Sequence, residues 1–426
     1  ERNINIILGS NTINAIAYYL ACLNKQAVPL FLSQNIKKYQ LQNYINRFSP
    51  FSIYSEILLE VDEASHISYE YSNLYIFKSN KKLTSKYPYL LLTTSGSTGN
   101  PKVVIISKKN LISNTESITQ YLKINKKDKH ITTLPLNYTY GLSCINTHLS
   151  KGASIVLTNE SILNKDFWEI LKIHEPNTFS GVPYTYEMIC RLGLKSLPLG
   201  CVEKFTQAGG KLANKYLKII GNYLDFKKDF YIMYGQTEAT ARMSYLPPKY
   251  FMSKRGSIGI PIPNGSFILN FDKKYPDYEG HSVGELIYKG PNVTSGYAES
   301  FNDLEKNFIH KETLETGDLA YQDCDGFYFI CGRINRFAKI SGLRISLDDI
   351  QNIINEKYKC AVTSNDLFIY IYLESNDCED PFEYVVKNLK EMILKKVNIN
   401  PIILKFKFID KIPVNDSNKI VYGDLN

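Results

Sequence analysis

A short loop rich in hydroxyl and glycine residues is the first chemically informative feature of the sequence. It runs from Thr93 to Lys102 (TTSGSTGNPK) and contains Gly96 and Gly99. Glycines let the backbone approach a ligand, and amide and hydroxyl groups in such a loop can converge on phosphate oxygens. Pro101 would fix the turn and present the Lys102 ammonium at its end. The spacing does not fit the Walker pattern. Taken alone, the loop leaves both a phosphate site and an ordinary turn open.

A hydroxyl next to a carboxylate follows a strand-like run farther along the chain. Tyr234-Gly-Gln-Thr-Glu238 comes directly after the apolar run Phe230–Met233. Ligands of open α/β sheets bind at the carboxyl ends of strands. Thr237 could hold a phosphate oxygen there, and Glu238 could bind Mg²⁺. A helix N-cap followed by a first-turn acid has the same pattern, so that alternative also stays open.

Three polar residues in the last third of the chain are suited to a nucleotide but are ambiguous singly. Asp318, in Thr316-Gly-Asp-Leu319, could accept hydrogen bonds from a ribose diol, or it could be an ordinary turn residue. Arg333 could reach ribose or phosphate, or be an exposed linker arginine. Lys419, close to the C-terminus, would ordinarily be a tail lysine. Their meaning depends on what the fold brings together.

The pattern of elements that must position these residues indicates an α/β fold. Ile13–Leu23 and Phe167–Ile173 read as helices, and Ser154–Leu157 reads as a strand. Such alternation predicts parallel sheets covered by helices. From about residue 256 to 332, short strands separated by Gly, Pro, Asn and Asp predict a small antiparallel or barrel-like subdomain.

A second domain is expected after residue 333, because 426 residues exceed one ordinary core. We predict a large domain over 1–333 and a small mobile α+β domain over 334–426. The small domain is predicted to contain helices at Leu347–Asn355 and Phe382–Lys395 and strands at Leu367–Leu373 and Ile402–Phe408.

Composition excludes several classes of protein. No apolar run reaches the roughly 18 residues of a membrane span, so no membrane insertion is expected. The eight cysteines and six histidines are scattered, which predicts no zinc or iron site. The net charge is +8, but the basic residues are spread along the chain, and we expect no nucleic-acid partner. The chain begins without Met or a leader pattern, so we predict a cytoplasmic protein and expect the sequence to start inside a longer one.

Seven segments in order resemble the adenylate-forming superfamily of acyl-CoA synthetases, peptide-synthetase adenylation domains and luciferases. The resemblance covers nearly the whole chain, although an opening strand and helix of the family are expected to be absent. The segments are Leu92–Lys102, Leu134–Leu142, Tyr234–Glu238, Gly284–Gly290, Thr316–Leu319, Gly332–Arg344 and Asn418–Lys419.

The resemblance implies an enzyme that uses ATP and Mg²⁺ to turn a carboxylic acid into an acyl-adenylate, with release of pyrophosphate. A thiol then takes the acyl group from AMP. By this likeness residues 1–333 form the AMP-binding adenylation domain, and Lys419, Thr237 and Glu238 are catalytic. The implied nucleotide-binding residues are Thr94, Ser95, Gly96, Ser97, Thr98, Lys102, Gly209, Gly210, Tyr234, Gly235, Thr237, Asp318 and Arg333, with Glu238 as the Mg²⁺ ligand.

The resemblance also implies that the small domain swings about a hinge to serve both steps. Asn335 stands at the hinge, where most members have Asp or Lys. Asn tolerates unusual backbone angles, so swinging remains compatible with the sequence. Gly342 and Leu343 would form the loop on the thiol side.

The acid is predicted to lack an α-ammonium group. Amino-acid-activating relatives place an Asp in the segment matching Leu136–Gly141, where this chain has Tyr138, and a buried ammonium without a carboxylate would be costly. Plain core packing explains an aromatic lining equally well. The predicted pocket consists of Tyr138, Ser180, Val182, Tyr184 and Ala208.

The favoured acceptor is the phosphopantetheine thiol of a carrier protein. Segments such as Ser180–Glu187 look like stand-alone ligases of bacterial surface-polysaccharide clusters. Free CoA as acceptor and a D-alanine-type carrier ligase are the alternatives. A non-catalytic nucleotide-binding scaffold of the same fold is a remote one, since the motif residues are retained.

Overall fold

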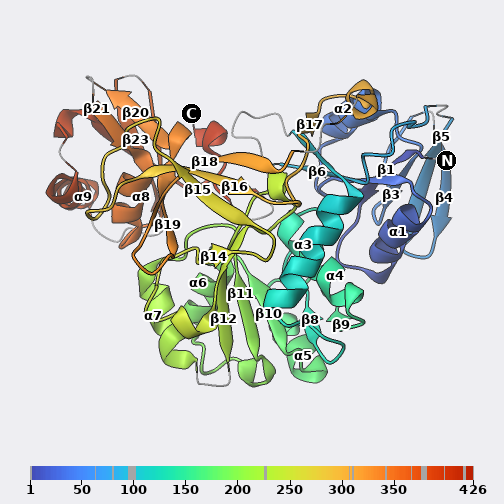
Figure 1. The fold of residues 1–426 in the computed structure, drawn as a ribbon, viewed down its shortest axis with the longest axis horizontal. Coiled ribbons are helices and arrows are strands. Elements are labelled where there is room, and N and C mark those ends of the chain that lie inside the picture. Colours follow the sequence, from blue (N-terminus) through green and yellow to red (C-terminus); the bar gives the residue numbers. More distant parts are fainter. Residues whose placement is uncertain are drawn as a thin grey trace.

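Two large sheets build most of the molecule in the computed structural model (Figure 1), which describes residues 2–62, 64–78, 81–94, 102–224, 228–306, 308, 311–340, 343–365, 367–375, 381–397, 399–415 and 419–425. The first sheet has eight strands, and β1, β2, β3 and β6 run parallel. Its order is β17 (Tyr297–Ala298), β7 (Val103–Ile106), β6 (Leu90–Thr93), β2 (Val28–Phe31), β1 (Ile4–Leu8), β3 (Ser52–Ser55), β5 (Ser72–Phe77) and β4 (Ala64–Tyr69).

The second sheet has seven strands, five of them parallel. Its order is β14 (Ile260–Pro261), β13 (Ser244–Leu246), β12 (Asp229–Tyr234), β11 (Lys204–Gln207), β10 (Thr178–Gly181), β8 (Lys129–Ile131) and β9 (Ser154–Val156). The helices before and between these strands are α1 (Ile13–Asn24), α2 (Lys38–Phe48), α3 (Lys108–Tyr121), α4 (Thr139–Ser150), α5 (Lys165–His174), α6 (Pro183–Leu192) and α7 (Asn214–Tyr223).

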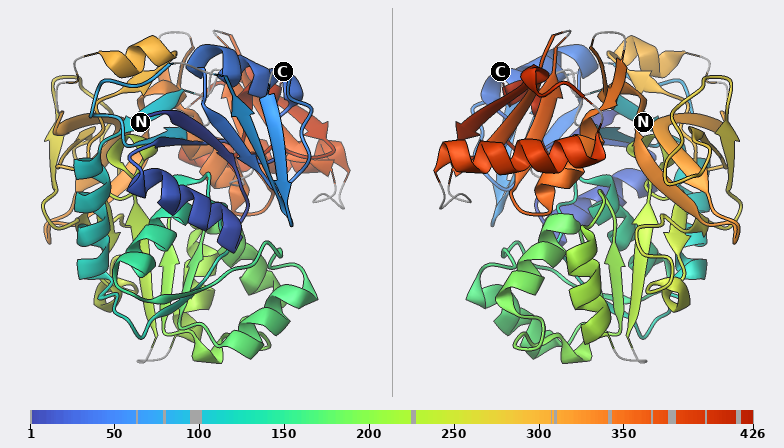
Figure 2. Two further views of the ribbon diagram at one scale, coloured as in Figure 1. Left: turned by 90° about the vertical axis from the view of Figure 1, so that its right-hand side faces the viewer. Right: turned by 90° about the vertical axis from the view of Figure 1, so that its left-hand side faces the viewer.

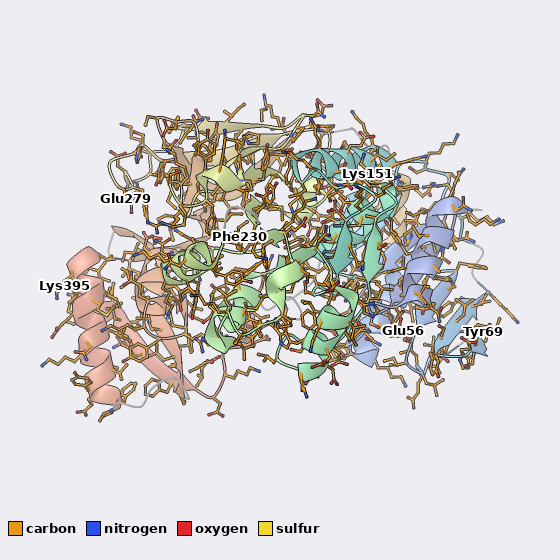
Figure 3. The ribbon with its side chains drawn as sticks, turned by 90° about the horizontal axis from the view of Figure 1, so that it is seen from below. Glu56, Tyr69, Lys151, Phe230, Glu279 and Lys395 are labelled. Carbon is orange, nitrogen blue, oxygen red and sulfur yellow. The ribbon has the colours of Figure 1, made fainter. Side chains whose placement is uncertain are left out.

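Side chains of β12 alternate between two cores, which shows how helices cover both faces of the second sheet. Phe230 packs with residues of α5, α6 and α7, whereas Tyr231 and Met233 pack with residues of α3 and α4. Helix α4 also faces the first sheet through Leu142 and Ile145. Its N-terminus is therefore held between the two sheets. Figure 3 shows Phe230 inside the molecule, with Lys395 and Tyr69 at opposite ends.

The predicted antiparallel subdomain is a four-stranded sheet. Its order is β15 (Ser266–Asn270), β16 (Gly284–Lys289), β18 (Thr313–Gln322) and β19 (Tyr328–Arg333). Strand β19 follows a turn that the Gly326 amide closes by donating to the Asp323 carbonyl at 3.0 Å. The parallel-sheet expectation is incomplete, since β6 and β7 form an antiparallel hairpin.

The last part of the chain packs around a hydrophobic cluster of its own, which includes Ile350, Ile371 and Leu389. Figure 2 shows α9 lying across the strands of this part. The predicted helices and strands are confirmed within two residues, and division of the chain at residue 334 stays a prediction. The elements are β20 (Phe337–Ile340), β21 (Leu343–Ser346), α8 (Leu347–Asn355), β22 (Cys360–Ser364), β23 (Ile369–Glu374), α9 (Phe382–Lys396) and β24 (Leu404–Ile409).

Two buried histidines predict a loss of stability in mild acid. His130 and His148 stack with ring centroids 4.8 Å apart, and burial lowers the pKa of both. The unfolded chain therefore binds protons that the folded chain excludes. The free energy of unfolding should fall as the pH drops below about 6.5. Urea unfolding at pH 7.5 and 5.5 measures this, and His148→Gln should reduce the pH dependence whereas the exposed His174→Gln should not. Equal dependence in all three proteins would contradict the assignment.

Candidate active site

The glycine-rich loop connects the antiparallel strands β6 and β7. The Thr94 amide donates to the Lys102 carbonyl at 3.0 Å and so closes the base of the loop. Ser95, Gly96, Ser97 and Thr98 lie outside the described residues. The exposed Lys102 side chain places Nζ 4.9 Å from the ring centroid of Tyr297, which belongs to the neighbouring strand β17.

Tyr297 links this loop to the carboxylate that follows β12. Its hydroxyl donates to Glu238 Oε1 at 2.7 Å. Burial and the nearby Glu238 carboxylate raise the pKa of Tyr297, so the phenol stays a hydrogen-bond donor at neutral pH. Glu238 lies in the short 3₁₀ helix η2 (Thr237–Ala239), and Thr237 Oγ1 is 2.9 Å from Thr139 Oγ1 at the start of α4. The edge of the first sheet and the carboxyl end of β12 therefore meet here.

Asp318 is the centre of a buried hydrogen-bond network at the same end of β12. Its side chain is 2% exposed and accepts from the Tyr234 hydroxyl at 2.5 Å and from Gln236 Nε2 at 3.1 Å. Arg333, its partner across the β18–β19 ladder, donates from Nε to Asp318 Oδ1 at 2.8 Å. A carboxylate can accept about four hydrogen bonds. Binding both hydroxyls of a ribose would thus require one present donor to move, and the half-exposed Arg333 is the one with access to solvent.

Glycines shape the backbone around this site. A Cβ on Gly235 would lie 1.8 Å from the Ala241 carbonyl oxygen, so only glycine fits between the end of β12 and the next turn. Gly209 has φ +91°, and a Cβ there would lie 2.6 Å from the Tyr138 hydroxyl. A Cβ on Gly210 would lie 3.2 Å from Pro183 Cγ. Close packing around the strand ends therefore requires glycine at Gly235 and Gly209.

Gly209→Ala is expected to destabilise the protein by roughly 1 to 3 kcal/mol because alanine is strained at this φ. The added methyl group should also displace Tyr138. Thermal unfolding measures the first effect, and acid-dependent activity measures the second. Gly200→Ala is the matched control, since a Cβ at Gly200 meets no atom within 4 Å. Equal unfolding temperatures for the two variants would contradict the close contact.

The C-terminal lysine reaches this region from more than eighty residues beyond Arg333. Lys419 is exposed, and its Nζ lies 5.5 Å from the ring centroid of Tyr138, just before α4. A hydrogen-bonded turn supports it, because the Lys419 amide donates to Asn415 Oδ1 at 3.0 Å. The segment that carries Lys419 therefore contacts the start of α4.

The structure describes the predicted hinge residue and one of the two predicted thiol-side residues. Asn335 is exposed in the 3₁₀ helix η5 (Ile334–Arg336) between β19 and β20. Gly342 lies outside the described residues. Leu343 begins β21, and its backbone pairs with Ile340. Hinge and thiol-side roles for these residues stay predictions.

Residues 5–298 match the model of the AMP-binding enzyme family. The chain belongs to this family. It is 29% identical to oxalate–CoA ligase of Arabidopsis thaliana over 62% of this chain and 52% of that protein. It is 26% identical to the Saccharomyces cerevisiae oxalate–CoA ligase over 78% of this chain and 61% of that protein. The matches thus span about half to three fifths of these two relatives.

Solved structures of AMP-binding enzymes share the fold. The Bacillus subtilis O-succinylbenzoate coenzyme A synthetase, in complex with ATP and magnesium, superposes with a TM-score of 0.76 at 21% identity, covering 99% of this chain and 89% of that one. ATP-bound MatB from Rhodopseudomonas palustris gives a TM-score of 0.76 at 19% identity, covering 100% and 88%. The predicted fold class, a large α/β domain followed by a small one, is confirmed.

The predicted acid pocket differs from the cavity that this member of the family contains. Tyr138, Val182, Tyr184 and Ala208 pack together in one hydrophobic cluster. A cavity of about 20 Å³ lies next to that cluster, and Ser180 is the only residue of the predicted five that lines it. A role in binding the acid stays a prediction for all five residues. The cavity walls include Tyr140, Cys144, Thr206, Met233 and Arg242.

Sequence reasoning missed three side chains that the structure brings to the site. Gln236 lies inside the quoted Tyr234–Glu238 motif, so its polar amide was a usable signal. Tyr297 had no local signal, since it meets Glu238 from a different sheet. Arg242 was unexpected because arginine is almost never buried without a partner.

Proposed function

We propose that the chain is an AMP-forming ligase that activates a carboxylic acid with ATP. The acid's carboxylate oxygen attacks the α-phosphorus, the bond to pyrophosphate breaks, and a phosphopantetheine thiol then displaces AMP from the acyl-adenylate. The observation that carries this proposal is the approach of Lys419 to Tyr138. It brings a cation from the end of the chain to the site that the two sheets form.

The proposed roles follow from the positions of the charges. Asp318 would accept the ribose hydroxyls, and Arg333, which now donates to that carboxylate, would stay beside it. The outer phosphates would be held by the loop from Thr94 to Lys102. The base would be bordered by Tyr234, Gly235, Gly209 and Gly210. Thr237 would donate to a phosphate oxygen. Lys419 would stabilise the charge that develops between the carboxylate and the α-phosphate.

Glu238 is the candidate Mg²⁺ ligand, and its surroundings fit that role. Tyr297 engages one carboxylate oxygen, and the other has no hydrogen-bond partner among the described residues. Mg²⁺ commonly binds proteins through one or two carboxylates together with substrate phosphates. Within the described part of the chain no group of three or more His, Cys, Asp or Glu side chains could hold a metal alone. Magnesium bound there would neutralise phosphate charge.

Glu238→Gln is expected to raise the Mg²⁺ concentration needed for half-maximal activity by about tenfold or more, the loss typical of a charged hydrogen-bonding ligand. A magnesium titration of pyrophosphate exchange checks this. The exposed Glu279→Gln serves as control. An unchanged magnesium requirement in Glu238→Gln would exclude the carboxylate as a ligand.

The proposed substrate is an acid without an α-ammonium group. None of the described residues that line the cavity is acidic, and Arg242 adds a positive charge to its wall. An ammonium there would be buried beside a cation without a counter-ion, which is unfavourable. A D-alanine-type ligase is therefore disfavoured.

A carrier protein and free CoA are the two candidate acceptors, and both present a phosphopantetheine thiol. A carrier protein is favoured by the likeness to stand-alone ligases, whereas free CoA is favoured by the names of the relatives, which are CoA ligases. We propose a cytoplasmic setting for either, since all seven described cysteines are free thiols. No described helix has the length and apolar character needed to cross a bilayer.

The test is exchange of labelled pyrophosphate into ATP with a panel of carboxylic acids, with mass spectrometry of the acyl-adenylate. Active acids are then offered CoA and a holo-carrier protein separately. We expect acid-dependent exchange and a thioester with one of the two thiols. Exchange with amino acids alone would overturn the substrate class. Nucleotide binding without exchange for any acid would favour the scaffold alternative.

A further inference from the structure

Arg242 is a buried cation without an anionic partner. Its residue is 3% exposed, and no carboxylate contacts it among the residues that the structure describes. Its guanidinium carbon lies 3.9 Å from the ring centroid of Tyr140, and its Nε lies 3.5 Å from the sulfur of Met233. Burying a guanidinium without a counter-ion is unfavourable. The ring and the sulfur compensate only part of that cost.

The backbone holds this side chain inward at a further cost. Thr240 has φ +55° and Ala241 has φ +108°, and a left-handed conformation is unfavourable for both residue types. The carbonyl of Arg242 accepts hydrogen bonds from Asn114 Nδ2 and Asn292 Nδ2, each at 2.9 Å. These contacts fix the turn between η2 and β13. The fold therefore maintains strain that keeps the charge inside.

Several other polar groups of the cavity wall are hydrogen-bonded to one another. The Tyr140 hydroxyl is 2.7 Å from Thr206 Oγ1, which is 2.8 Å from Ser180 Oγ. The Ser180 hydroxyl in turn lies 3.3 Å from Cys144 Sγ. Lys204, a second cation in the cavity wall, pairs with Asp128 at 2.9 Å, whereas no described oxygen accepts a hydrogen bond from the Arg242 guanidinium. A cavity of about 20 Å³ holds about one or two waters, roughly the size of a carboxylate.

Two aromatic rings connect this cation to the one proposed to act in catalysis. Lys419 lies over the ring of Tyr138, Tyr138 and Tyr140 are in edge contact with centroids 6.2 Å apart, and Arg242 lies over Tyr140. Lys419 would face the reacting carboxylate at one end. A substrate that extends past the rings toward Arg242 would place its far end against a second positive charge.

We propose that Arg242 determines specificity, and that the acid is a compact one with a second anionic group, which pairs with this guanidinium. This inference rests on the proposed function and names its substrate class. The second group would supply the missing counter-ion. An uncharged acid of the same shape would leave the guanidinium unpaired and would bind worse.

The experiment compares each short dicarboxylate with its own half-amide. Malonate, succinate and glutarate are tested with malonamate, succinamate and glutaramate in pyrophosphate exchange, and kcat/KM is measured for each pair. The wild type should prefer at least one dicarboxylate by about 10- to 100-fold, as expected for a hydrogen-bonded charge. Arg242→Met should reduce that preference to near one. Arg242→Lys, which retains the charge, should keep part of it.

A second readout does not depend on turnover. The favoured dicarboxylate with ATP should raise the unfolding temperature of the wild type and of Arg242→Lys, but not of Arg242→Met. ATP alone should stabilise all three, which shows that the variants are folded. Exchange that favours uncharged acids, or a preference unchanged in Arg242→Met, overturns this inference while the proposed function stands. If no acid supports exchange, the proposed function fails, and the dicarboxylate-induced shift alone decides the role of Arg242.

Discussion

Lys419→Ala is expected to slow acyl-adenylate formation by roughly 10²- to 10³-fold, the loss typical of one well-placed electrostatic donor. Lys419 is exposed and makes no ion pair among the described residues, so its removal should hardly change stability. The variant should therefore bind ATP normally and fail in the first step. Acid-dependent pyrophosphate exchange measures that step directly.

The second half-reaction separates a catalytic lysine from a structural one. Thioester formation from a preformed acyl-adenylate should proceed at nearly the wild-type rate in Lys419→Ala, because the step in which Lys419 is proposed to act has then already taken place. Lys411→Ala, an exposed lysine of the same segment, should leave both half-reactions intact. Exchange that survives in Lys419→Ala would remove the residue from the mechanism. A parallel loss of both steps would instead indicate damage to the fold.

Elements with a strong local pattern could be predicted from the sequence. Helix α8 begins and ends where it was expected, because its apolar residues follow the helical period and Ser346 caps it by accepting from the Asp349 amide at 3.1 Å. The strand before Tyr234 was equally clear, since a short apolar run ends at a glycine. These local signals place the motif at a strand end, where ligands bind.

Contacts between distant segments could not be predicted in the same way. Tyr297 approaches Glu238 because β17 pairs with β7 at the edge of a different sheet. The pattern of apolar residues along the sequence does not predict that pairing. Arg242 follows the motif by four residues and looks like a surface arginine. Its burial depends on a left-handed turn at Thr240 and Ala241, two residues that ordinarily avoid this conformation. The cavity it lines was missed for the same reason.

Asp318→Asn is expected to raise the KM for ATP by about 10- to 100-fold, because a charged acceptor for the ribose hydroxyls is lost. The side-chain amide of this variant would also face Arg333, whose Nε donates a hydrogen bond to Asp318 Oδ1 at 2.8 Å in the wild type. Arg333 is half-exposed and can be solvated, so the protein should remain folded, with a loss of about 1 to 3 kcal/mol in stability. Initial rates of exchange over a range of ATP concentrations measure the effect on nucleotide binding.

Deoxy nucleotides test whether that effect arises at the ribose. With the wild type, 2′-deoxy-ATP or 3′-deoxy-ATP should be a poorer substrate than ATP, since a hydroxyl that the carboxylate would accept from is missing. With Asp318→Asn the same deletion should cost little more, because the two changes remove one interaction. The exposed Asp272→Asn should discriminate as the wild type does. If the losses in Asp318→Asn and in the deoxy nucleotides instead multiply, Asp318 acts only by holding Tyr234, Gln236 and Arg333 in place, and the ribose must bind elsewhere.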